Sequence, residues 1–297
     1  MTLFRRRAHL YFIAAFAALC LFIWLVATPN NKSEVIFKRG LIYGKGGDAD
    51  LLLDLAMPKA GIGPLPVVVF LHGKGWRAGD RSDMSSLVEG IARLGYVGVA
   101  VGYRLVPKAR FPAQVEDCKA AIRWIRAHAS EYRIDPRKIG VVGFSAGGYL
   151  AAMLGTTIIT DGLEGSGGTG EQSSEVRAVV SFFGPTDFTT RDWPADLETE
   201  VIVPFLGGTF ADKPDNYLRA SPINFVKKVA VSFLFFHGAE DVLVPVNQSM
   251  RLAEKLRGVG VPARVIIFER EGHGFSDATN QVAMKQMLEF LAESFAQ

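Results

Sequence analysis

The chain has 297 residues, enough for one large domain, and its 49% hydrophobic and 21% charged residues are typical of a protein with a sizeable core. Arg5, Arg6 and Arg7 account for the net charge of +3, so the rest of the chain is balanced. This balance argues against a nucleic-acid-binding surface, which needs clustered basic charge. Cys20 lies in an apolar run and Cys118 on the apolar stripe of a predicted helix, so we expect no disulfide and a buried, inert Cys118.

The N-terminal segment predicts a connection to a membrane. After the three arginines, 18 residues from Leu10 to Ala27 carry no charge, and a helix of that length nearly spans a bilayer core of about 30 Å. We interpret residues 1–28 as a signal anchor; a cleaved signal peptide and a buried core helix are the alternatives. Because arginines stay cytoplasmic, the body is expected outside the cytoplasmic membrane, or secreted if the segment is cleaved.

The pattern that follows is that of an α/β fold. Residues 29–40 are polar and indicate a linker, and from Leu41 on apolar runs alternate with amphipathic stretches, which favours a mostly parallel sheet. Strands are expected at Leu51–Leu55, Val67–Leu71, Val97–Val101, Ile139–Gly143, Ala178–Phe183, Ser232–Phe236 and Arg264–Phe268. Helices are expected at Ser86–Leu94, Ala113–Glu131, Gly147–Leu154, Val246–Leu256 and Val282–Ala296.

Two connections are long. Gly162–Ser174, "GLEGSGGTGEQSS", has the composition of a flexible surface loop. Residues 185–228 mix Trp193, Phe205 and Leu206 with polar residues. Excursions of this kind commonly cover the carboxyl edge of a parallel sheet, where ligands bind, so we interpret 185–228 as a candidate lid or pocket wall.

The strongest chemical signal is "GFSAGG" at 143–148, a G-x-S-x-G motif between an expected strand and an expected helix. A tight turn there would lift the Ser145 hydroxyl above the sheet edge, at the positive end of the following helix. Ser145 is therefore the predicted nucleophile, and a structural turn serine is the alternative. A serine hydroxyl needs a base, which a carboxylate orients.

His273 is the predicted base among five histidines. It lies in the glycine-flanked loop "EREGHGFSD" after the last expected strand, which agrees with the chain order serine, acid, histidine of this motif. The other four have structural explanations: His9 in the membrane segment, His128 on a helix, and His72 and His237 in turns that end strands.

The predicted acid is Asp241. "FLFFHGAEDVLVP" places Glu240 and Asp241 side by side after a late strand, and adjacent side chains point in different directions, so only one can face the base. The H-G-x-x-D spacing and the following "VLVP" favour Asp241, which leaves Glu240 as a solvated carboxylate. Asp187, in "FFGPTDF", is interpreted as a loop-bracing acceptor.

These features resemble the α/β-hydrolase superfamily, and within it the esterase branch with acetyl-xylan and feruloyl-type esterases and hormone-sensitive-lipase-like enzymes. The resemblance runs from Leu41 to the C-terminus and includes "GWRAGDRS", "GYRLVPKARFPAQVEDCKAAIRWIR", "FFGPTDF", "LRASPI" and "HGAEDVLVPVNQS". It implies an eight-stranded, mostly parallel sheet flanked by helices and a serine hydrolase mechanism.

In similar enzymes an H-G-G-G loop supplies backbone N–H groups to an oxyanion hole. Here the loop is His72-Gly73-Lys74-Gly75, so Gly73, Lys74 and Gly75, together with Ala146 after the nucleophile, are the expected donors. Lysine is compatible with this role provided that its position does not need φ > 0. The Lys74 ammonium either points to solvent or lines the pocket mouth and favours acidic or sugar-bearing substrates.

The leading function is a membrane-tethered serine carboxylesterase for small-acyl esters, with an acylated sugar among the candidate substrates. An amide hydrolase (formamidase- or peptidase-like) with the same triad and a non-catalytic interaction protein on a hydrolase scaffold are the alternatives. No metal or cofactor is expected, because no H-E-x-x-H or clustered Cys/His motif is present. The acyl length, the alcohol portion and the oligomeric state stay open.

Overall fold

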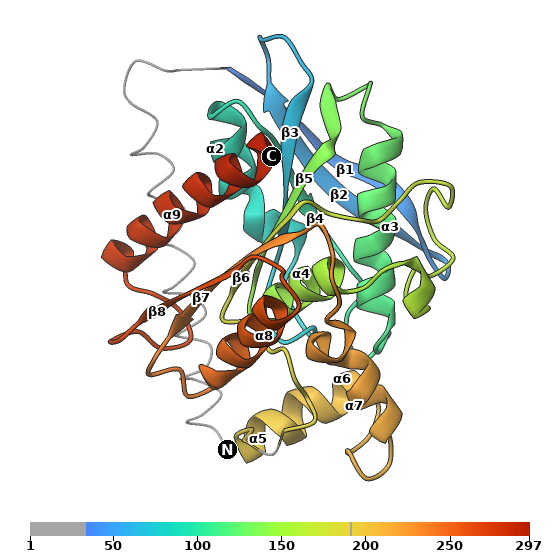
Figure 1. The fold of residues 1–297 in the computed structure, drawn as a ribbon. Coiled ribbons are helices and arrows are strands. Elements are labelled where there is room, and N and C mark those ends of the chain that lie inside the picture. The colour runs from blue at the N-terminus through green and yellow to red at the C-terminus, as the bar shows by residue number, and fades with distance from the viewer. Residues whose placement is uncertain (1–33, 191) are drawn as a thin grey trace.

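The computed structural model describes residues 34–190 and 192–297. They form an eight-stranded sheet in the order β1-β2-β4-β3-β5-β6-β7-β8 (Figure 1). The β1–β2 and β2–β4 pairs are antiparallel, and all other pairs are parallel. The strands are β1 (Val35–Gly46), β2 (Ala49–Pro58), β3 (Leu65–Leu71), β4 (Val97–Val101), β5 (Ile134–Phe144), β6 (Ala178–Phe182), β7 (Ser232–Gly238) and β8 (Ala263–Phe268).

Helices cover both faces of the sheet, which explains why its strands are continuous apolar runs. In β3, Val67, Val69 and Leu71 face one apolar cluster, and Val68 and Phe70 face another. The helices α2 (Ser85–Arg93) and α9 (Asp277–Ala296) pack on the second cluster. On the other face lie α3 (Ala113–Ala127), α4 (Ala146–Thr156) and α8 (Asn247–Gly258) (Figure 1).

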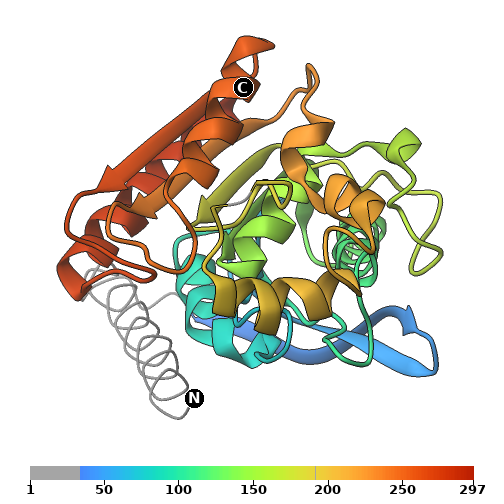
Figure 2. The same ribbon diagram turned by 90° about the horizontal axis from the view of Figure 1, so that it is seen from below.

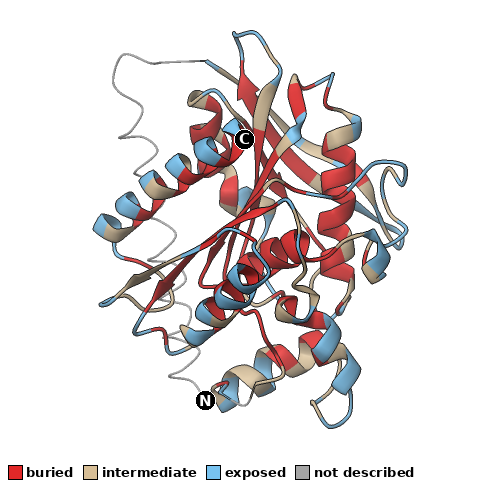
Figure 3. Cartoon of the chain, viewed as in Figure 1, coloured by how far each residue is buried: buried red, intermediate tan, exposed pale blue. Residues whose placement is uncertain are grey.

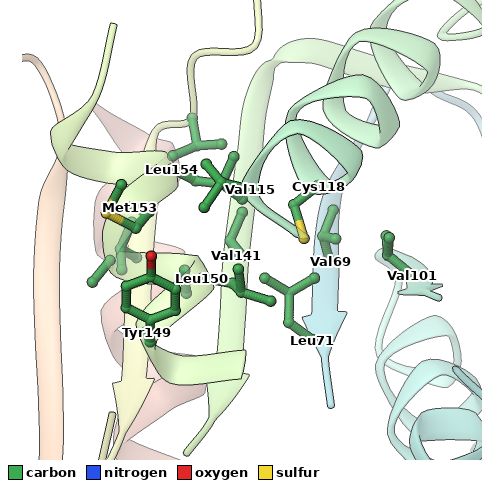
Figure 4. Packing of buried hydrophobic residues seen from close by; sticks show 14 of the residues in the cluster. Val69, Leu71, Val101, Val115, Cys118, Val141, Tyr149, Leu150, Met153 and Leu154 are labelled. Carbon is green, nitrogen blue, oxygen red and sulfur yellow. The ribbon is translucent and has the colours of Figure 1, made fainter. Parts of the chain in front are cut away.

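The core shows why the second cysteine is inert. Strands β4, β6 and β7 and helix α4 are buried along their length, whereas α2, α8 and α9 are buried on their inner sides (Figure 3). Cys118 lies on the inner side of α3, among the side chains of Val69, Val101 and Val115 (Figure 4). It is free, is 1% exposed, and burial raises the pKa of its thiol well above the ordinary value. The expectation of a buried thiol is confirmed.

The expected strands and helices are present, with shifted ends. The expectation of a linker over 29–40 is wrong for Val35–Gly40, because these residues begin β1 and pair with β2, for example Lys38 opposite Leu55. Edge strands have one neighbour and are only partly buried, so a polar composition does not exclude them. Another shift is at α9, which begins at Asp277, five residues before the expected start at Val282.

The glycine-rich stretch 162–174 lies mostly at the surface, as expected, but it is anchored to α3 through Glu164. Glu164 accepts hydrogen bonds from Lys119 Nζ at 2.7 Å and from Arg123 Nη1 at 2.6 Å, and both cations are buried in α3. Ser174 Oγ also donates to Glu164, at 2.7 Å. The anchoring partners lie 41 and 45 residues away in sequence, where local composition gives no sign of them.

Within residues 185–190 and 192–228, short helical segments lie together near α4 and α8 (Figures 1 and 2). These are α5 (Ala195–Leu197), η3 (Glu198–Ile202), α6 (Val203–Leu206), α7 (Pro214–Ala220) and η4 (Pro222–Phe225). Phe205 of α6 stacks on Trp76 in the loop after β3, with ring centroids 4.0 Å apart. The segment therefore packs against the loop that the sequence assigns to the oxyanion hole.

No helix within residues 34–190 and 192–297 is long and apolar enough to cross a membrane. The expected signal anchor over residues 1–28 and the first part of the expected linker lie outside the described residues. From Val35 on, the described chain folds around the single sheet.

Candidate active site

Ser145 lies on a sharp turn between β5 and α4, with φ 53° and ψ −115°. Its N–H donates to Phe182 O of the neighbouring strand β6, at 2.8 Å. The flanking glycines have a steric cause. A Cβ at Gly143 would lie 2.0 Å from Gly147 O, and one at Gly147 would lie 2.1 Å from Leu71 O. Only glycine fits at either position, so the G-x-S-x-G spacing follows from the packing of the turn.

The structure brings the three residues of the predicted triad together from the carboxyl ends of three parallel strands. Ser145 Oγ lies 2.8 Å from His273 Nε2, and His273 Nδ1 lies 2.8 Å from Asp241 Oδ2. His273 follows β8 and Asp241 follows β7. The second carboxylate oxygen, Oδ1, accepts the backbone N–H groups of Leu243 and Val244, each at 2.9 Å. The carboxylate is thus fixed at one oxygen while the other faces the imidazole.

Asp241 is 9% exposed and is nevertheless favoured in its charged form. Burial raises the pKa of its carboxyl, but the adjacent His273 and the hydrogen bonds from His237 and His273 outweigh burial and hold the pKa well below the ordinary value. The carboxylate is therefore ionised at neutral pH, as required of a group that stabilises an imidazolium. Serine, imidazole and carboxylate in this order can transfer the hydroxyl proton to the imidazole as Ser145 attacks an electrophile.

The loop after β3 lies against the Ser145 turn. A Cβ at Gly73 would lie 2.8 Å from Phe144 O and 3.4 Å from Ser145 Cβ, so a larger residue would push the loop away. Trp76 Nε1 donates to Ala146 O at 3.2 Å, which ties the loop to the first turn of α4. Two of the four expected oxyanion donors therefore lie beside Ser145. Gly73 packs closely against the Ser145 turn, and Ala146 is the next residue in the chain.

Lys74 has φ 71°, so the condition under which lysine would suit this position is not met. A left-handed backbone at a residue other than glycine costs about 1–2 kcal/mol. The side chain is 36% exposed, and its ammonium lies 2.8 Å from Asp83 Oδ2. Asp83 Oδ2 also accepts the N–H of Asp80, at 3.1 Å. An ion pair, which neither sequence interpretation included, therefore holds the Lys74 side chain.

The buried side chain of His72 stabilises the same loop. Its ring stacks on Tyr103, with centroids 4.2 Å apart, and its Nδ1 lies 3.1 Å from Gly73 O. Tyr103 Oη donates to His72 O at 2.7 Å. Burial lowers the pKa of His72 to about 4, so the ring is neutral at physiological pH. His72 therefore has the structural role that the sequence assigned to it.

Two further residues lie beside the predicted triad: Phe183, which the sequence did not single out, and His237, to which it assigned only a structural role in a turn. Phe183 has φ 42°, which is unusual for an aromatic residue, and its ring centroid lies 4.8 Å from that of His273. His237 lies 3.3 Å from Asp241 Oδ2 through its Nε2. The four-residue spacing of His237 and Asp241 was visible in the sequence, whereas the backbone conformation of Phe183 had no sequence signal. Glu240, the alternative acid, is exposed.

Within 34–190 and 192–297, no three His, Cys, Asp or Glu side chains gather as a metal site would require.

The comparison with known proteins agrees with this architecture. The BD-FAE family model matches residues 53–256, which include Ser145 and Asp241. The chain is 33% identical over 224 residues to the probable carboxylic ester hydrolase LipM of Mycobacterium tuberculosis. The aligned region covers 73% of this chain and 51% of LipM. It is 32% identical over 251 residues to Esterase LipC of the same organism, covering 81% of this chain and 60% of LipC. The chain thus spans about half to three fifths of these curated relatives.

Solved structures of esterases share the fold over nearly the whole described chain. A truncated carbohydrate esterase from gut microbiota superposes with a TM-score of 0.78 at 28% identity, covering 90% of this chain and 99% of that one. An esterase of Thermogutta terrifontis with bound propionate superposes with a TM-score of 0.72 at 28% identity, covering 89% and 96%. From the family match, the shared fold and these relatives, we conclude that the chain belongs to the BD-FAE family of α/β-hydrolase esterases.

Proposed function

We propose that the protein is a serine carboxylesterase that hydrolyses small-acyl carboxylic esters through an acyl-enzyme. The observation that carries this proposal is the hydrogen-bonded series from Ser145 Oγ through His273 to Asp241, with 2.8 Å at each step. Nucleophile and base within hydrogen-bond reach, with the base oriented by a third group, is the signature of nucleophilic catalysis. The esterase relatives support the same reaction class.

The reaction follows from these positions. Ser145 Oγ attacks the ester carbonyl carbon while its proton passes to His273 Nε2, and Asp241 stabilises the imidazolium. The tetrahedral intermediate collapses, the carbon–oxygen bond to the alcohol breaks, and His273 returns the proton to the departing alcohol. Water then attacks the acyl-Ser145 ester with His273 again as the base, which releases the acid and restores the serine hydroxyl.

The oxyanion of each intermediate would be bound by backbone N–H groups of Gly73, Lys74, Gly75 and Ala146; the left-handed backbone of Lys74 strains that residue but leaves its N–H in place. The close approach of the Gly73 backbone to the Ser145 turn, which leaves no room for a Cβ, and the Trp76–Ala146 hydrogen bond support this assignment, because both keep the loop beside α4. Ala146 also begins α4, whose positive end favours negative charge. Removal of one such donor typically lowers the rate by about 10²–10³-fold.

For the substrate, we propose a short acyl group, with an acylated sugar as a candidate alcohol portion. The bound propionate of the Thermogutta esterase and the carbohydrate esterase among the structural neighbours support these two parts. Residues 185–228 would act as the wall or lid of the pocket. Their packing on Trp76, through Phe205 and a hydrogen bond from Arg77 to Glu200 O, supports this role.

For the location, we propose that residues 1–28 anchor the chain in the cytoplasmic membrane with the catalytic domain outside the cytoplasm. The supporting observation is the sequence of three arginines followed by 18 uncharged residues. Cleavage of this segment would give a secreted enzyme instead.

The test uses the full-length chain in mild detergent with p-nitrophenyl acetate, butyrate and octanoate. We expect fast turnover of the short esters and loss of that turnover in Ser145→Ala. Turnover of a p-nitroanilide but no ester would favour the amide hydrolase, and turnover of neither would favour a non-catalytic protein. Equal ester turnover in the wild type and in Ser145→Ala would contradict the assigned nucleophile.

A further inference from the structure

His237 is the last side chain of β7 before Gly238, and its ring lies near the same oxygen of Asp241 as the base does. Its side chain is fully buried. Its Nε2 lies 2.8 Å from Val244 O and 3.3 Å from Asp241 Oδ2, and its Nδ1 lies 2.8 Å from Ser249 Oγ. Both ring nitrogens therefore contact residues that follow Asp241 in the chain, Val244 and Ser249.

The position of the Nε2 proton follows from these contacts. A carbonyl oxygen only accepts hydrogen bonds, so the 2.8 Å contact with Val244 O requires that Nε2 carries a proton. The same nitrogen lies 3.3 Å from Asp241 Oδ2, which accepts from His273 Nδ1 at 2.8 Å. One carboxylate oxygen thus lies between two imidazoles, one of which reaches Ser145.

The contact with Val244 has a second consequence for Asp241. The N–H of Val244 donates to Asp241 Oδ1 at 2.9 Å, while its carbonyl accepts from His237. His237 therefore positions Val244, whose N–H binds Asp241 Oδ1, and it also lies 3.3 Å from Asp241 Oδ2. Loss of the Nε2 donor would release both constraints at once.

We propose that His237 is a positioning residue for the acyl transfer: it fixes the Asp241 carboxylate so that Oδ2 faces His273 Nδ1. This inference rests on the proposed esterase function. It goes beyond the Ser145, His273 and Asp241 assignment, in which His237 has no part. The role is distinct from that of a core histidine, whose loss would weaken folding without changing the rate per folded molecule.

Two variants of similar polarity separate these roles. In His237→Gln, the amide nitrogen replaces Nε2 and can still donate to Val244 O and Asp241. In His237→Asn, the shorter amide reaches only as far as Nδ1, so the donor to both groups is lost. A core truncation on α8, Leu252→Ala, serves as the matched control, because Leu252 is fully buried and the predicted chemistry does not involve it.

The full-length chain is assayed on p-nitrophenyl acetate, and active sites are counted by titration with a fluorophosphonate. We expect His237→Asn to lower kcat by roughly tenfold, with KM within about twofold, since a hydrogen bond to a charged group has an effect of this order. His237→Gln should keep kcat within about threefold of the wild type, and Leu252→Ala should lower Tm while leaving kcat within about twofold. Equal kcat in the Gln and Asn variants, whether high or low, would overturn the proposal.

A spectroscopic readout separates this proposal from the function on which it rests. The low-field proton resonance of the His273 Nδ1–H in contact with Asp241 should shift or broaden in His237→Asn and persist in His237→Gln. An unchanged resonance in His237→Asn would overturn the positioning role. Absence of ester turnover in the wild type, with the resonance responding as expected, would instead contradict the esterase function alone.

Discussion

Replacing Asp241 with asparagine should remove nearly all activity, because the carboxylate accepts hydrogen bonds at both ends. Oδ1 accepts the N–H groups of Leu243 and Val244, and Oδ2 accepts from His273 Nδ1 with His237 Nε2 nearby. An amide has one accepting and one donating end. In either orientation, the asparagine NH₂ group faces donors: two backbone N–H groups or two imidazoles.

The magnitude follows from the orientation that keeps His273 as a base. The amide oxygen must then accept from His273 Nδ1, so the NH₂ group meets the N–H groups of Leu243 and Val244. Two donors, Val244 N–H buried and Leu243 N–H partly buried, lose their acceptor at about 2 kcal/mol each, or about 4 kcal/mol in total. At 1.36 kcal/mol per tenfold change in rate, kcat should fall by about 10³-fold, with KM nearly unchanged.

The assay is the steady-state hydrolysis of p-nitrophenyl acetate by the full-length chain, with Glu240→Gln as the matched control. Glu240 is the adjacent carboxylate and is exposed, so its amide variant should keep the wild-type rate. If Asp241→Asn retains more than a tenth of the activity, or if Glu240→Gln loses as much, the assignment of the acid is refuted.

Three further predictions follow from other parts of the site and the fold. The double variant Lys74→Gly/Asp83→Asn should leave the preference between neutral and anionic esters unchanged, because the ion pair that it removes has no net charge. A changed preference in paired assays would contradict this. The pKa of His72 is about 4 in the folded protein and 6.5 in its ordinary state, so at a pH between these values the ring gains a proton when the chain unfolds. The free energy of unfolding should therefore fall by about 3 kcal/mol as the pH drops from 6.5 to 4. Urea denaturation should show that His72→Asn flattens this dependence, and an unchanged slope would contradict the cause. Glu164→Gln should lower the free energy of unfolding by roughly 3 kcal/mol at neutral pH, since it removes the counter-charge of buried Lys119. The kcat of this variant should stay within about twofold of the wild-type value. A denaturation midpoint equal to that of the wild type would show that Glu164 does not anchor the loop in this way.

Much of the fold could be predicted because the parallel strands are buried on both faces. Val67–Leu71 is apolar at every position, and such a run has few alternatives to a central strand. Ser145 and His273 could be proposed for a related reason: each follows a strand in a glycine-rich turn, and the carboxyl ends of parallel strands meet at one edge.

The parts that could not be predicted depend on contacts between distant residues. β1 is half-buried and partly polar, so Val35–Gly40 carried no strand signal without its partner β2. The anchoring of Glu164 depends on cations in α3, and the Lys74–Asp83 pair joins residues nine positions apart in the chain. The composition of a segment does not report a partner elsewhere in the fold.

The central claim is that Ser145 is the nucleophile of an ester hydrolase. The most direct measurement is the reaction of the full-length chain with a fluorophosphonate, followed by peptide mass spectrometry and by the ester activity of the same samples. The proposed mechanism predicts one adduct, on Ser145, and loss of activity in proportion to it. An adduct on another residue, or full ester turnover in the fully labelled protein, would contradict the claim.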